Sequence, residues 1–152
     1  MAHFSLKLES DLKNIIKSDD VNSLMILFKN HEYELTNNVL YRVNEDLMTH
    51  AIKRNSVKCI DYLIDRQYPF KPLWFSSNGI PALFERDPER AKKILQFSLI
   101  QINKLLKDGI PDYKNQPNHP CWELLTRISS NINYIHYYKN IFNAFKENHV
   151  SV

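Results

Sequence analysis

Glycine and cysteine are both scarce in this chain of 152 residues, and each scarcity excludes a class of protein. The only two glycines are Gly79 and Gly109. A phosphate-binding loop needs several glycines so that its backbone can approach the phosphate groups, so a nucleotide-binding loop is excluded. Two cysteines, Cys59 and Cys121, are too few for a disulfide scaffold. We therefore expect a domain that folds around an apolar core and holds no cofactor.

Long apolar runs and a strong excess of one charge are also absent. No run approaches the roughly 18 apolar residues that cross a bilayer, and the first residues lack the apolar segment of a signal peptide. The 20 basic and 17 acidic side chains are mixed along the chain, without the concentrated basic stripe of a nucleic-acid binder. We expect a cytoplasmic protein, in the producing cell or inside a host cell, with neither membrane nor nucleic acid among its partners.

What the chain does contain is an internal repeat with an offset of 36 residues. Residues 12–28 (LKNIIKSDDVNSLMILF) and 48–64 (MTHAIKRNSVKCIDYLI) align position by position. Each copy holds two apolar stripes at helical spacing, separated by a polar corner. Paired short helices that recur every roughly 20 to 50 residues are typical of stacked repeat proteins, which bind other macromolecules through an extended face.

The same pattern of helix pairs and connectors continues along the chain. The connector at 32–43 has some extended character, whereas 68–79 holds two prolines and a closing Asn-Gly that exclude a helix. We predict one all-α domain over residues 1–152, with about eight helices in four stacked pairs. The expected pairs span 5–31, 44–67, 80–107 and 120–147.

Polar residues at the corners predict where the second helix of each pair begins. Asp19 or Asp20 is the expected N-cap of a helix from 20 to 31. Ser56 is the expected N-cap of the helix at about 56–67. Asp87, with proline after it, opens a helix that runs to about residue 107. Cys59 falls on the apolar side of its helix and is predicted to be buried.

The connectors resemble those of ankyrin repeats. In that family the second helix ends in Leu-Leu-x-x-Gly-Ala, and the next first helix opens with Thr-Pro-Leu-His. Residues 105–113 (LLKDGIPDY) and 118–125 (NHPCWELL) match this pattern at Gly109 and Pro120, although no copy holds the full Thr-Pro-Leu-His. Gln67 stands where the second pair would carry the glycine.

The resemblance implies a solenoid whose loops and first helices line a concave binding face. It also implies a non-enzymatic module for protein–protein interaction. Degenerate ankyrin proteins of this kind are similar to those of intracellular bacterial pathogens and large DNA viruses, so we expect an effector or host-interaction protein that binds a target protein. The alternative is an immunity protein or antitoxin-type inhibitor that blocks a partner enzyme.

Large aromatic side chains in the loops are the candidates for partner contacts, since such residues anchor binding hot spots. The competing interpretation is that Phe70, Leu73 and Trp74 fill the core between the second and third repeats. The last predicted helix carries more apolar surface than a capping helix requires, so we expect it to dock a partner or to self-associate. The candidate contact residues are Tyr68, Phe70, Trp74, Phe75, Tyr113, Trp122 and Tyr137.

Only the surroundings of Cys121 suggest chemistry. A cysteine nucleophile needs an imidazole within hydrogen-bond reach, but His119 precedes a helix-opening proline and its side chain should diverge from the thiol. No Cys-x-x-Cys or His-x-x-x-His spacing occurs. An enzyme with a centre at Cys121 and His136 is therefore kept as a third alternative. We assign no catalytic, cofactor-binding or metal-binding residue.

Overall fold

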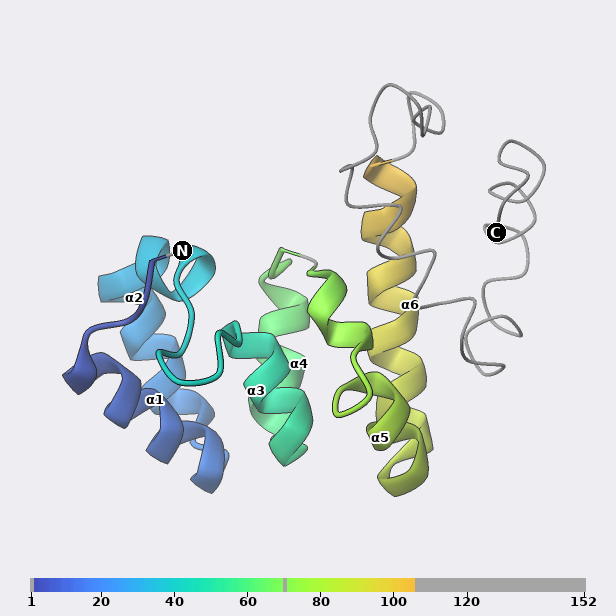
Figure 1. Cartoon of the computed structure of the whole chain (residues 1–152), viewed down its shortest axis with the longest axis horizontal. Coiled ribbons are helices and arrows are strands. Elements are labelled where there is room, and N and C mark those ends of the chain that lie inside the picture. Colours follow the sequence, from blue (N-terminus) through green and yellow to red (C-terminus); the bar gives the residue numbers. More distant parts are fainter. Residues whose placement is uncertain (1, 70, 106–152) are drawn as a thin grey trace.

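The computed structural model describes residues 2–69 and 71–105, and this part of the chain is all-α (Figure 1). No strand occurs in these residues, although His3 and Val39 form an isolated parallel bridge. The helices are α1 (Leu6–Ser18), α2 (Val21–Asn37), α3 (Leu47–Arg54), α4 (Val57–Asp65), α5 (Ile80–Arg86) and α6 (Pro88–Leu105), with a short 3-10 turn, η1 (Pro72–Phe75), before α5.

The helices form three adjacent pairs that stack along the molecule (Figure 1). The first helices pack in one row, α1 on α3 and α3 on α5, and the second helices in another, α2 on α4 and α4 on α6. The all-α class and the packing of adjacent pairs are thus confirmed for the described part of the chain. The fourth expected pair, at 120–147, lies outside the described residues.

The corners inside the first two pairs have the same backbone geometry. The first helix of each pair ends at a residue in the left-handed region, Asp19 with φ 53° and Asn55 with φ 48°. Each donates its backbone N–H to the equivalent two carbonyls, which are Ile15 and Ile16 in the first pair and Ala51 and Ile52 in the second. Asp and Asn tolerate this conformation better than other residues with a side chain. The two corners, 36 residues apart in the sequence, therefore share one turn geometry.

The corners also join one helix pair to the next. The carboxylate of Asp19 accepts hydrogen bonds from the backbone N–H groups of Lys58 and Cys59, both at 3.0 Å. In return, the hydroxyl of Ser56 donates to the carbonyl of Ile16. These bonds satisfy backbone groups that helix ends leave without partners. Ser56 is the N-cap residue of α4, as predicted, but its hydroxyl bonds to α1 and makes no capping bond to α4.

Helix α2 is longer than predicted, because it continues past the expected end at residue 31. The backbone leaves helical geometry at His31 (φ −137°, ψ 37°) and then resumes it as far as Asn37. The added turn buries Leu35 completely. This burial explains why a stretch that reads as a polar connector is helical in the folded chain.

The other helix starts follow their capping residues. Asp20 begins α2 by accepting a hydrogen bond from the N–H of Ser23 at 3.2 Å. Asp87 does the same for α6 through the N–H of Arg90, also at 3.2 Å. Helix α3 begins at Leu47, later than the expected 44, because Asp46 is its N-cap.

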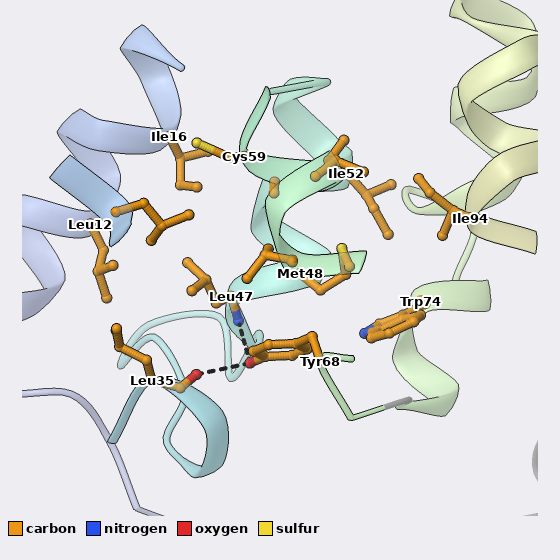
Figure 2. Packing of buried hydrophobic residues seen from close by; sticks show 14 of the residues in the cluster. Leu12, Ile16, Leu35, Leu47, Met48, Ile52, Cys59, Tyr68, Trp74 and Ile94 are labelled. Carbon is orange, nitrogen blue, oxygen red and sulfur yellow. Dashed lines mark hydrogen bonds between the residues drawn. The ribbon is translucent and has the colours of Figure 1, made fainter. Parts of the chain in front are cut away.

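One apolar core runs through all three helix pairs (Figure 2). It includes Leu12 and Ile16 from α1, Met48 and Ile52 from α3, and Ile94 from α6, each at most 1% exposed. Burying one such side chain contributes about 1.5–3 kcal/mol to folding. Cys59 is also fully buried, as predicted.

Candidate interaction surface

Three of the four aromatic residues of the 68–79 connector are described, and all three lie in the core. Tyr68 is 2% exposed, Trp74 0% and Phe75 3%. This burial argues against contact between these three side chains and a partner. It favours the competing interpretation for Trp74, and Tyr68 and Phe75 are buried in the same way. The physical reason is area: a large aromatic side chain removes more apolar surface from water than any other, and the connector places it between pairs.

Hydrogen bonds hold these buried aromatic side chains in place. The hydroxyl of Tyr68 donates to the carbonyl of Leu35 at 3.0 Å and accepts from the N–H of Leu47 at 3.3 Å (Figure 2). The indole N–H of Trp74 donates to the carboxylate of Asp46 at 2.9 Å. Tyr68 therefore joins the end of α2 to the start of α3, and Trp74 joins η1 to the cap of α3. Burial raises the pKa of the Asp46 carboxyl, while the bonds from Thr49 and Trp74 oppose that rise.

The remaining predicted contact and catalytic residues lie outside the described residues. These are Phe70, Tyr113, Trp122 and Tyr137, and the Cys121, His119 and His136 group. Of the two cysteines, the described one is Cys59, and its burial raises the pKa of its thiol to about 12. A thiol with that pKa stays protonated at neutral pH and is unreactive.

Neither a metal-binding cluster nor a membrane-spanning helix occurs in the described residues. They contain no group of three or more His, Cys, Asp or Glu side chains arranged to hold a metal ion. Within the same part of the chain, every helix is too short or too polar to cross a membrane.

The exposed apolar side chains gather at the first helix pair and the loop that follows it. Of the seven large hydrophobic residues that are exposed in the described part, six lie between residues 6 and 43. These six precede the predicted contact residues, the first of which is Tyr68. The set comprises Leu6, Met25, Ile26, Tyr33, Tyr41, Val43 and Ile100.

Two of these residues, Tyr41 and Val43, stand on the loop between α2 and α3. We call residues 39–45 the α2–α3 loop. Tyr41 is 61% exposed and Val43 53% exposed, with the exposed Arg42 between them. An aromatic, a cationic and an aliphatic side chain are thus presented next to one another. Aromatic residues and Arg are the commonest anchors of protein interfaces.

The α2–α3 loop is held by hydrogen bonds within itself. The N–H of Leu40 donates to the carbonyl of Glu45 at 2.9 Å, and the N–H of Asn44 donates to the carbonyl of Leu40 at 2.9 Å. Asn44 adopts a φ of 50°, which closes the turn. Asn is among the residues that tolerate this region.

Contacts with the N-terminal segment and α1 also support the loop. The N–H of Tyr41 donates to the buried carboxylate of Glu9 in α1. The ring of His3 packs edge-on against the ring of Tyr41, with centroids 5.1 Å apart, and its Nε2 pairs with the side chain of Asn44 at 3.0 Å. The backbone of Val39 bonds to both Ala2 and Phe4 at 3.0 Å. The loop is therefore ordered by its own structure without a partner.

Sequence reasoning missed Tyr41 and Val43. They lie in the stretch at 32–43 that reads as a connector, and no helical or strand period marks them as exposed. The one available signal was the occurrence of aromatic and aliphatic residues in a connector that is otherwise polar.

Comparisons with known proteins give no relative: no family model, no curated protein and no solved structure matches this chain.

Proposed function

We propose that the protein is a non-enzymatic module that binds a partner protein through the α2–α3 loop. The observation that carries the proposal is the exposure of Tyr41 and Val43 on a loop that is already fixed by hydrogen bonds. A preformed loop loses little conformational entropy on binding, so its contacts contribute more fully to affinity.

The resemblance to ankyrin repeats supports the same proposal. The packing of first helices on first helices and second on second is the arrangement expected of stacked helix pairs. Gln67 occupies the position of the family's helix-ending glycine, and its φ of 60° is one that glycine adopts without strain. The α2–α3 loop corresponds to a connector between repeats, which in that family contributes to the binding face.

For the role of this binding, we propose an effector or host-interaction protein that acts in the cytoplasm. An immunity protein that blocks a partner enzyme would use the same surface. No described residue favours the enzyme alternative, since the Cys121 group lies elsewhere in the chain and the thiol of Cys59 stays protonated.

The test is capture of binding partners from cell lysate with wild-type protein and with Tyr41→Ala. A partner bound through this loop should lose about tenfold or more in affinity, because truncating a hot-spot aromatic costs more than about 1.4 kcal/mol. The thermal unfolding of the variant should match wild type, since the side chain is exposed.

The matched control is Met25→Ala, an exposed apolar side chain at the other end of α2. It should leave capture unchanged. If Tyr41→Ala and Met25→Ala retained every partner at wild-type affinity, the loop would not be the binding surface.

A further inference from the structure

A cleft separate from the α2–α3 loop lies between α2 and the segment that follows α4. Its volume is about 180 Å³, close to the size of one large side chain. Phe28, Glu32 and Thr36 from α2 line one side, and Gln67, Tyr68 and Pro69 from the segment after α4 line the other. Arg66 forms part of the wall. The cleft thus combines an ion pair, Arg66 with Glu32, with polar and aromatic residues.

The guanidinium of Arg66 is held in position by two aromatic rings. It lies 4.6 Å from the ring centroid of Phe28 and 5.8 Å from that of Tyr62. The two rings pack edge-on, with centroids 5.7 Å apart, so the platform is itself fixed. A stacked Arg keeps its planar set of N–H donors oriented for a carboxylate and loses little entropy on binding one.

Arg66 has two present partners, and one of them is a carboxylate that can be displaced. Its Nη1 donates a hydrogen bond to the hydroxyl of Tyr62 at 3.4 Å. One terminal nitrogen of the guanidinium pairs with the Glu32 carboxylate at 2.6 Å. The Glu32 side chain is 70% exposed, while that of Arg66 is 33% exposed. Exposed ion pairs contribute little to stability, because water solvates both charges almost as well. Glu32 therefore shows that Arg66 pairs with a carboxylate, and the exposure of Glu32 allows another carboxylate to replace it.

We propose that this cleft is a carboxylate-binding site, which takes an acidic side chain from a partner protein in place of Glu32. The carboxylate would receive two parallel N–H bonds from Arg66, the geometry that makes such pairs strong and specific. Thr36 and Gln67 are placed to hydrogen-bond the partner's polar groups. The proposal is independent of the α2–α3 loop, and its test uses a small probe and no partner.

The test is an NMR titration with N-acetyl-L-glutamic acid N-methylamide, followed at the Arg66 side-chain N–H and the Gln67 amide. Wild type should bind weakly, and Glu32→Gln should bind the probe about two- to fivefold more tightly, because the internal competitor is gone. Arg66→Lys should remove the response, since an ammonium provides neither the planar donor pair nor the ring stacking.

Two controls complete the design. Glu34 lies on the same helix as Glu32, but its carboxylate pairs with His31. Glu34→Gln should therefore leave the affinity for the probe at the wild-type value. The glutamine analogue of the probe, which lacks the charge, should not bind.

Unchanged affinity in Glu32→Gln, or equal binding of the uncharged analogue, would overturn the proposal. Tighter binding of N-acetylglycine, whose carboxylate mimics a chain terminus, would overturn the assignment to an acidic side chain. Circular dichroism of each variant checks that the fold persists, so lost binding cannot be mistaken for unfolding.

Discussion

Four described residues other than glycine adopt a positive φ, and three of them are Asp or Asn. Asp19 and Asn55 end first helices, and Asn44 closes the α2–α3 loop, so each serves as a turn residue of the type that tolerates this region. Gln67 is the exception, with φ 60°. A side chain with no local hydrogen-bonding compensation costs roughly 1–2 kcal/mol in this conformation. At the scale of single residues, strain is therefore concentrated beside the Arg66 cleft.

Replacing Gln67 by glycine should stabilise the protein. The relief of left-handed strain exceeds the extra entropy that glycine gives the unfolded chain, so we expect a gain of about 0.5–1 kcal/mol in the free energy of unfolding. The measurement is urea unfolding at constant m-value. Gln96→Gly, the same change at an exposed position inside α6, should instead destabilise by about 1 kcal/mol. Equal effects of the two substitutions would contradict this account of Gln67.

At the scale of helices, the ends of one pair supply the hydrogen-bond partners for the next. Asp19 caps α4 although it belongs to the corner of the first pair, and Ser56 bonds back to α1. The second corner also bonds to the next helix pair. The side-chain amide of Asn55 donates to the carboxylate of Asp87, the cap of α6, at 3.1 Å. The polar corners predicted three helix starts, but only the stacking of pairs decides which corner bonds to which helix.

The bond between Asn55 and Asp87 predicts a dependence on pH. It is the first cause of the lowered pKa of the Asp87 carboxyl, whose ordinary value is 3.8. A lowered pKa means that the carboxylate stabilises the fold above its unfolded-state pKa and loses this contribution as the pH falls through its folded-state pKa. Asn55→Gly keeps the left-handed turn and removes the bond. NMR titration of the variant should place the Asp87 midpoint nearer 3.8 than in wild type.

Asp20 provides the internal reference for that titration. Its pKa is lowered mainly by the hydroxyl of Ser23 at 2.6 Å, a bond that Asn55→Gly does not touch. Its midpoint should therefore stay unchanged. An unmoved Asp87 midpoint would show that Asn55 does not set the pKa of this carboxyl.

At the scale of the whole molecule, the 68–79 connector joins the three helix pairs. Tyr68 and Trp74 stack with centroids 6.3 Å apart, and Trp74 and Phe97 of α6 stack at 6.1 Å. Trp74 also bonds to Asp46, the cap of α3, and Tyr68 bonds to Leu35 of α2. The described part of the chain therefore has a continuous core, and its stability is shared among elements that are distant in sequence.

Trp74→Ala should lower the free energy of unfolding by about 3–5 kcal/mol, the usual cost of deleting a buried aromatic side chain. It also removes the indole hydrogen bond to the buried Asp46 carboxylate. Chemical unfolding followed by circular dichroism is the measurement. Tyr41→Ala provides the comparison, with a change within about 0.5 kcal/mol expected for an exposed side chain. A small effect of Trp74→Ala would contradict its place in the core.

The sequence by itself determined the three described helix pairs, the corners inside them and the capping residue Asp87, and it narrowed the cap of α2 to Asp19 or Asp20. These features depend on local periodicity and on turn chemistry, which act over a few residues. Only the tertiary structure decided that Trp74 is buried while Tyr41 is exposed, since an aromatic residue in a connector carries no periodic signal. Burial depends on which surfaces distant segments cover, and that is set by the packing of whole helix pairs.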